Sequence, residues 1–194
     1  MAPSSRRHGR LFIISAPSGA GKSTLCAALR NRFTDLGYSI SFTTRQPRGK
    51  ETDGREYHFI SESEFRRSIE NGGWAEWAQV HGNYYGTSAE ALERMLATGR
   101  DVLLDIDVQG ADQLFRKFPE SVGIFIMPPD METLRERLTG RNTDSPEVIE
   151  RRLEDARDEI AEKEPLKDII VNEELSKPEV ELLAIVDRFR FASY

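Results

Sequence analysis

The chain has 194 residues and a formal net charge of −6, a length that favours one domain and a charge that argues against a nucleic-acid coat protein. Its single cysteine, Cys26, excludes an internal disulfide framework, and three scattered histidines (His8, His58 and His81) argue against a structural zinc site. The early apolar run at residues 11–14 is too short for a signal peptide or a membrane span, so we expect a cytoplasmic protein with no membrane partner.

Strand and helix patterns alternate along the chain after a basic tail at residues 1 to about 9. Apolar or alternating runs predict strands at residues 11–15, 39–44, 55–60, 74–80, 102–106, 122–127 and 168–171. Helical spacing predicts helices at residues 23–33, 62–71, 91–96, 131–138, 146–163 and 176–189, with one more between residues 106 and 122. This alternation indicates an α/β fold, a parallel sheet with helices on both faces and ligands at the carboxyl ends of its strands.

Residues 39–88 depart from that alternation and indicate a small mixed lobe of antiparallel strands. Within it, Ser61 and Glu64 have the spacing of a capping box before a helix. Asn83-Tyr84-Tyr85-Gly86 is interpreted as a turn after the strand at residues 74–80.

The most informative segment lies between the first strand and the first helix and reads Ala16-Pro17-Ser18-Gly19-Ala20-Gly21-Lys22-Ser23-Thr24. Its glycines let backbone N–H groups turn inward around phosphates, at the positive end of the following helix. Lys22 can reach the β- and γ-phosphates of a nucleoside triphosphate, and Ser23 can bind Mg²⁺. Ala16 stands where the consensus has its first glycine. A chance turn rich in glycine and serine is the alternative, but the strand and helix around the segment favour triphosphate binding.

A second segment, residues 41–51, places Arg45 and Arg48 on either side of Pro47, and Tyr57 follows in the next predicted strand. Two guanidinium groups suit a dianionic monophosphate because each can donate two parallel hydrogen bonds. A solvated basic turn would have much the same composition, so this segment alone leaves both interpretations open.

The third segment embeds Glu76 between Trp74 and Trp77 in a predicted strand. A carboxylate in apolar surroundings must find hydrogen-bond donors. Guanine offers two adjacent N–H donors on its Watson–Crick edge, whereas adenine presents an acceptor at the matching ring nitrogen. Both tryptophans can simply be core side chains, but that interpretation does not explain Glu76.

Taken together, these segments resemble the guanylate kinase family, whose members phosphorylate GMP from ATP. The resemblance extends from Ala16 to Asn172, and its specific parts are Thr43-Thr44-Arg45-x-Pro47-Arg48 with Glu51, the run from Gly82 to Gly86, and Leu104-Asp105-Ile106-Asp107-x-x-Gly110. It implies a P-loop NTPase-type parallel sheet flanked by helices, with an inserted mixed α/β GMP-binding lobe and a helical lid. The core would be residues 10–38, 89–138 and 158–194, the lobe residues 39–88, and the lid residues 139–157.

The resemblance also assigns roles to individual residues. Guanine would be held by Ser41, Glu76, Thr87 and Asp107. The GMP phosphate would be held by Arg45, Arg48, Tyr57 and Tyr85, with Glu51 positioning the arginines. The ATP phosphates would be met by the loop from Ala16 to Thr24 and by the lid arginines Arg137, Arg141 and Arg152. Asn172 would lie beside the adenine, and Asp105 would contact Mg²⁺ through water. Asn142 stands where relatives often have glycine, which would stiffen the lid hinge.

These roles imply phosphoryl transfer without a general base, because the accepting phosphate oxygen is already anionic at neutral pH. Catalysis would then depend on positioning and on cations, namely Lys22, Arg45 and the lid arginines, with GMP, dGMP and ATP as small-molecule substrates. By charge pattern alone, Arg151 and Arg152 would be a salt-bridged exposed helix face.

Three rival functions remain. A non-catalytic module that binds phosphopeptides would typically lack the intact loop from Gly19 to Ser23. A related kinase acting on ribose bisphosphate would share the loop and the fold, but the signature around Arg45 and Glu76 argues against it. A GTPase switch would need an Asn-Lys-x-Asp motif, which the chain lacks. A homo-oligomer is compatible with the sequence.

Overall fold

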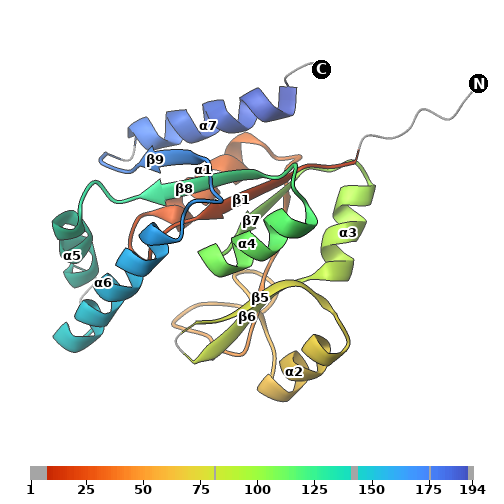
Figure 1. Cartoon of the computed structure of the whole chain (residues 1–194), viewed down its shortest axis with the longest axis horizontal. Helices are drawn as coiled ribbons and strands as arrows, with labels where there is room; N and C mark the ends of the chain where they lie inside the picture. Colours follow the sequence, from red (N-terminus) through yellow and green to blue (C-terminus); the bar gives the residue numbers. More distant parts are fainter. Residues whose placement is uncertain (1–7, 81, 141–143, 175, 192–194) are drawn as a thin grey trace, which may run out of the picture. The chain divides into compact units, whose positions relative to one another are not determined.

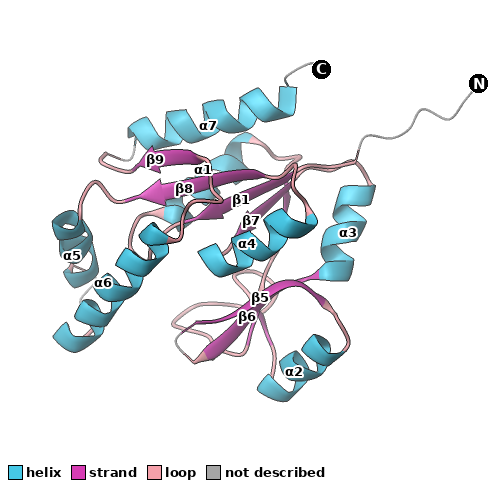
Figure 2. Cartoon of the chain, in the orientation of Figure 1, coloured by secondary structure: helices cyan, strands magenta, loops and turns pink. Residues whose placement is uncertain are grey.

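The computed structural model describes residues 8–80, 82–140, 144–174 and 176–191, and Figure 1 labels its helices and strands. Strands and helices alternate along most of the chain, as the periodicity predicts (Figure 2). Within these ranges no helix is long and apolar enough to cross a membrane.

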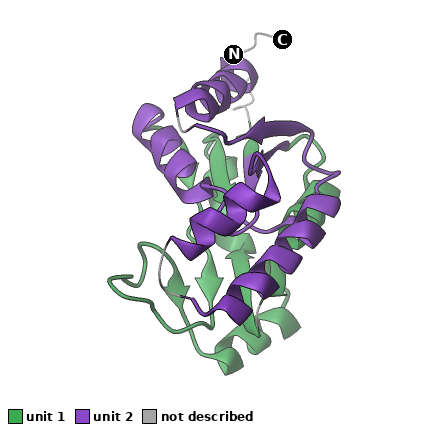
Figure 3. Ribbon diagram, turned by 90° about the vertical axis from the view of Figure 1, so that its left-hand side faces the viewer, with its two compact units in different colours: residues 1–11, 35–104, 109–121 green, residues 12–34, 105–108, 122–194 purple. Residues whose placement is uncertain are grey.

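The chain divides into two compact units, which Figure 3 shows in green and purple. The first unit consists of Met1–Leu11, Asp35–Leu104 and Gln109–Ser121. The second unit consists of Phe12–Thr34, Asp105–Val108 and Val122–Tyr194.

The larger sheet has five strands in the order β2-β7-β1-β8-β9. They are β1 (Leu11–Ser15), β2 (Gly37–Tyr38), β7 (Val102–Asp105), β8 (Val122–Met127) and β9 (Asp168–Val171). The pairs β2 with β7, β1 with β8, and β8 with β9 are parallel. All of β1 and nearly all of β8 are buried, as expected of parallel strands covered on both faces. The prediction of a parallel α/β sheet is therefore confirmed.

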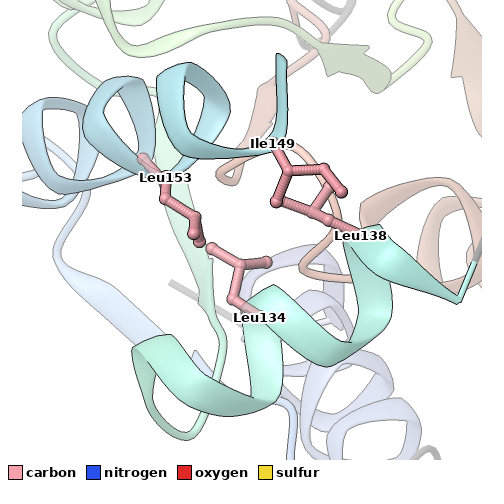
Figure 4. Packing of buried hydrophobic residues seen from close by; sticks show 5 residues of the cluster. Leu134, Leu138, Ile149 and Leu153 are labelled. Carbon is pink, nitrogen blue, oxygen red and sulfur yellow. The ribbon is translucent and has the colours of Figure 1, made fainter. Parts of the chain in front are cut away.

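Four helices belong to the second unit: α1 (Lys22–Arg32), α5 (Met131–Thr139), α6 (Pro146–Ala161) and α7 (Ser176–Phe191). Helix α7 packs against α1 and β9. Helices α5 and α6 pack together through the buried side chains of Leu134, Leu138, Ile149, Leu153 and Ala156 (Figure 4). Helix α6 begins with Pro146, a residue suited to the first helical position because its nitrogen has no hydrogen to leave unpaired.

The first unit holds a four-stranded sheet in the order β4-β3-β6-β5. Its strands are β3 (Phe42–Thr43), β4 (His58–Phe59), β5 (Trp74–Val80) and β6 (Asn83–Ser88). Helices α2 (Glu62–Glu70) and α3 (Ala89–Ala97) belong to the same unit, as does α4 (Val108–Lys117) apart from its first residue. The predicted capping box is confirmed, since Ser61 Oγ accepts from the Glu64 backbone N–H at 3.2 Å and Glu64 Oε2 accepts from the Ser61 N–H at 2.9 Å.

The small core of this sheet is aromatic. Phe65 from α2 stacks on Trp74 of β5 and Tyr84 of β6, with ring centroids 4.3 and 5.2 Å apart. All three side chains are buried. Trp77, by contrast, is 36% exposed, so the interpretation of both tryptophans as core holds for Trp74 only.

The predicted turn at residues 83–86 is wrong, because these residues form most of β6. Val80 already pairs with Asn83, and Gly82 has φ of 79°, so the chain reverses before Asn83. Gly86 lies inside the strand, where a Cβ would come within 2.9 Å of Phe65 Cζ and 3.1 Å of the Glu76 carbonyl oxygen. The glycine therefore provides space for packing and not a turn.

Three further expectations need correction. The lobe is not wholly antiparallel, because β3 pairs with β4 in parallel while β3 and β5 each pair with β6 in antiparallel. The strands predicted at residues 39–44 and 55–60 are only two residues long. The tail ends earlier than predicted, since Gly9 is buried and its N–H donates to the Leu96 carbonyl at 2.9 Å.

Candidate active site

The loop of residues 16–24, hereafter the phosphate loop, lies in the second unit and enters α1 through two glycines in the left-handed conformation. Their φ angles are 97° at Gly19 and 96° at Gly21, values that residues with a side chain rarely adopt. Helix α1 starts at Lys22, has no side-chain cap and carries no acidic residue in its first turn. Such a helix N-terminus presents backbone N–H groups and a positive dipole end to an anion.

Asn172, the first residue after β9, ties the phosphate loop to the sheet. Its Nδ2 donates to the Ala20 carbonyl at 2.7 Å, and it occupies the space that a Cβ at residue 21 would need. Its Oδ1 is buried and has no hydrogen-bond partner among the described residues. The residue therefore leaves one acceptor for a bound molecule.

The leucines of the α5–α6 contact support the same loop. A Cβ at Gly19 would lie 3.0 Å from both Leu134 Cδ1 and Leu138 Cδ2, the two leucines of α5 in Figure 4. The phosphate loop thus rests on the apolar contact between two helices.

Lys22 lies at the carboxyl end of β7. Its Nζ forms an ion pair with Asp105 and donates to the Ile106 carbonyl at 3.3 Å. Ser23 is exposed beside it. Ser23 and Asp105 offer oxygen ligands, the kind Mg²⁺ prefers. One turn into α1, Cys26 is buried, and this burial raises the pKa of its thiol, which stays protonated at neutral pH.

Two of the predicted lid arginines contact the phosphate loop or Asn172, which is hydrogen-bonded to that loop. Arg137 Nη2 donates to the backbone carbonyl of Asn172 at 2.8 Å, while its Nη1 is buried with no partner in the part of the chain that the structure describes. Arg152 of α6 bridges the Asp144 carboxylate and the Ser18 hydroxyl of the phosphate loop. Arg152 is therefore not part of a merely salt-bridged exposed face. Arg141 and Asn142 lie outside the described residues.

Glu159 of α6 was not identified from the sequence. Burial raises its pKa to about 7, and the charges that act on it include Lys22, Asp107, Asp155 and Glu162. The charged sequence of this helix predicts an exposed residue at this position. The burial of Glu159 arises from tertiary packing, which the local sequence does not predict.

In the first unit, Arg45 is the centre of the predicted monophosphate site. It is 8% exposed and forms two hydrogen bonds with Glu51, at 2.9 and 3.0 Å. These bonds are the main reason that the pKa of Glu51 is lowered and that of Arg45 is raised. The Arg45 guanidinium lies 5.3 Å from the ring centroid of Tyr57, which meets Tyr85 edge-on at 5.9 Å. A fixed cation thus lies beside two phenol rings.

Arg48 is placed differently from Arg45. Glu51 accepts its backbone N–H at 2.7 Å, while the side chain is exposed. Glu51 therefore fixes Arg45 by its guanidinium and Arg48 only by its main chain. Ser41 is half-buried, and its carbonyl accepts the N–H of His58 at 2.9 Å.

The third predicted feature is a buried carboxylate in the same unit, on strand β5. Glu76 is 3% exposed and lies opposite Thr87 in the β5–β6 pair. The Thr87 hydroxyl donates to Glu76 Oε1 at 2.6 Å. Asp107, the fourth predicted guanine ligand, belongs to the second unit.

A family model described as "Guanylate kinase" matches residues 8–188 of the chain. The chain belongs to the guanylate kinase family. A guanylate kinase from Geobacter metallireducens is 51% identical over 181 residues, which cover 93% of this chain and 89% of that protein. A guanylate kinase from Dechloromonas aromatica is 50% identical over 178 residues, with 92% and 88% covered.

Solved structures agree with this family. The crystal structure of guanylate kinase from Anaplasma phagocytophilum superposes with a TM-score of 0.78 at 32% identity, covering 96% of this chain and 88% of that one. A gluconokinase from Sinorhizobium meliloti has a TM-score of 0.52 at 16% identity, a similarity that concerns the fold alone. The guanylate kinase resemblance inferred from the motifs is confirmed.

Proposed function

We propose that this chain transfers the γ-phosphoryl group of ATP to GMP, and also to dGMP, giving ADP and the nucleoside diphosphate. The observation that carries the choice of acceptor is the buried Glu76 carboxylate of β5, which accepts from Thr87 in the same unit that contains the Arg45–Glu51 pair. A buried carboxylate favours a base with two adjacent N–H donors, and the paired arginine favours its phosphate. Membership of the guanylate kinase family supports the same reaction.

In this proposal the phosphate loop and Lys22 bind the ATP phosphates, and Asn172 lies beside the adenine. Arg137, Arg141 and Arg152 add positive charge where negative charge develops during transfer. Arg45, Arg48, Tyr57 and Tyr85 hold the GMP phosphate, while Ser41, Glu76, Thr87 and Asp107 hold the guanine. The accepting oxygen is already anionic, so none of these residues needs to remove a proton.

The oxygen donors Ser23 and Asp105 fit a magnesium ion, since hard oxygen ligands are the ones it prefers. When bound with ATP, Mg²⁺ supplies charge neutralisation at the phosphates. Lys22 then exchanges its ion pair with Asp105 for a phosphate oxygen. Residues 39–88 and 139–157 act as the GMP lobe and the lid and exclude water, the competing acceptor. We expect this reaction to take place in the cytoplasm.

The test is a coupled assay of ADP release with GMP, dGMP, AMP and ribose 1,5-bisphosphate as acceptors. GMP and dGMP should support rapid turnover, and the other two should not. Turnover with ribose 1,5-bisphosphate alone would transfer the assignment to the rival kinase. Absence of turnover with every acceptor, together with no heat on titrating GMP by calorimetry, would overturn the proposal.

A further inference from the structure

Helix α4 runs along the free edge of the small sheet. Strand β5 is the last in the order β4-β3-β6-β5, and among the residues that the structure describes it pairs with β6 alone. Gly110, Gln113 and Lys117 of α4 are spaced three and four residues apart, so they share one helix face. We call these three residues the α4 brace.

Two members of the α4 brace bind the backbone on either side of Glu76. The Gln113 amide pairs with Trp77 as a neighbouring strand would: its Oε1 accepts from the Trp77 N–H at 3.2 Å, and its Nε2 donates to the Trp77 carbonyl at 2.7 Å. Lys117 Nζ donates to the Ala75 carbonyl at 2.5 Å. The residues before and after Glu76 are thus both held by α4.

The third member, Gly110, meets the Glu76 side chain itself. A Cβ at residue 110 would lie 3.0 Å from Glu76 Cδ and closer still to Oε2. The φ of Gly110 is not in the positive range, so space and not backbone conformation requires a glycine here. A glycine inside a helix is less favourable than an alanine, so the space that Glu76 occupies explains the glycine at this position.

We propose that the α4 brace positions Glu76 for base recognition and that Gly110 is a specificity-determining position. Oε1 of Glu76 accepts from Thr87, and Oε2 lies where a Cβ at residue 110 would stand. A side chain at residue 110 displaces the carboxylate, so that two adjacent N–H donors of a base no longer reach both oxygens. This role rests on the proposed function, because it assumes that Glu76 reads guanine.

The first experiment compares thermal unfolding of Gly110→Ala in two backgrounds, without any substrate. In the wild-type background Gly110→Ala should lower Tm, because the new methyl group collides with Glu76. In the Glu76→Ala background the same change should raise Tm, because only the gain in helix propensity remains. Gln109→Ala, at an exposed position next to it on α4, is the matched control and should shift Tm equally in both backgrounds. The same shift of Tm for Gly110→Ala in both backgrounds would contradict the close approach of Glu76 to residue 110.

The second experiment measures steady-state kinetics. Gly110→Ala should raise the KM for GMP by about 10-fold or more and reduce the preference for GMP over AMP, while the KM for ATP stays within about twofold. Gln113→Leu, which removes both bonds to Trp77 and leaves Gly110 in place, should change the same parameters in the same direction. Wild-type kinetics in both variants would overturn the role of the α4 brace. A wild-type chain inactive on GMP would instead overturn the proposed function.

Discussion

Asn172 donates its side-chain N–H to the carbonyl of Ala20 at 2.7 Å, across 152 positions of sequence. Asn172→Asp keeps the shape of this residue but removes the donor, and it places a carboxylate against a carbonyl in a site only 4% exposed. We expect the free energy of unfolding to fall by about 1 to 3 kcal/mol, the usual effect of an unsatisfied buried group. The KM for ATP should rise as the phosphate loop loses its anchor.

Urea unfolding and initial rates measure both effects of Asn172→Asp. Asn31→Asp, at an exposed position of α1, is the control and should leave the KM for ATP unchanged. Equal stability of the two variants would contradict the anchoring role of Asn172.

Lys22→Ala should reduce turnover by at least ~10³-fold, the scale of losing a charge-stabilising group at a transferring phosphoryl. Removal of Lys22 also takes away the cation paired with Asp105, so the negative charge of the Asp105 carboxylate then repels the ATP phosphates. Single-turnover measurements with saturating ATP separate this loss from weakened binding. Lys177→Ala, at an exposed position, should behave as wild type. Wild-type turnover in Lys22→Ala would disprove the assigned role.

Arg151 and Arg152 are sequence neighbours with different surroundings, which makes them a matched pair. Arg152→Ala removes the bridge between Asp144 and Ser18 and should lower kcat by about 10²-fold. Arg151 is exposed, and Arg151→Ala should change kcat by less than about twofold. Similar losses of kcat in both variants would show that turnover depends on the overall charge of the helix and not on the bridge made by Arg152.

Glu76→Gln replaces one oxygen by an NH₂ group at constant shape. Facing two N–H donors of guanine, the new amide repels one of them, so kcat/KM for GMP should fall by about 10- to 100-fold. The KM for ATP should stay constant. Competition between GMP and AMP in one assay gives the selectivity directly. Unchanged kinetics with GMP would remove Glu76 from base recognition.

Glu159 gives stability a dependence on pH near neutrality. Its pKa is raised from 4.5 to about 7 by burial, so its protonated form stabilises the fold. This contribution is complete below pH 4.5 and is lost as pH rises through 7. Glu159→Gln should therefore become more stable relative to wild type between pH 5 and pH 8. Chemical unfolding across this range measures the trend, with Glu154→Gln, an exposed residue of the same helix, as control. Parallel curves for wild type and Glu159→Gln would refute it.

Where periodicity was strong, the sequence predicted the fold closely. The strand at residues 122–127 has the predicted bounds, because a buried parallel strand is a continuous apolar run. The strand at residues 168–171 also has the predicted bounds, although Ile170 is its one buried residue. Gly86 misled the prediction. Glycine marks a turn in most sequences, but here it makes room for Phe65 and Trp74, which come from distant positions.

The site was predictable where local motifs carry the chemistry. The phosphate loop follows from its glycines, and the pairing of Arg45 with Glu51 follows the predicted positioning role. Gln113 and Asp144 could not be identified, because their contacts with Trp77 and Arg152 depend on how helices pack. No local pattern encodes such contacts.

The closed environment of Cys26 makes the chain convenient to label. This thiol is the only one in the sequence, and it is both buried and held protonated. Maleimide dyes should therefore not react with Cys26 in the native protein, but should react with cysteines introduced at exposed positions. Pairs of fluorophores could then report domain movement by energy transfer without first removing the natural cysteine.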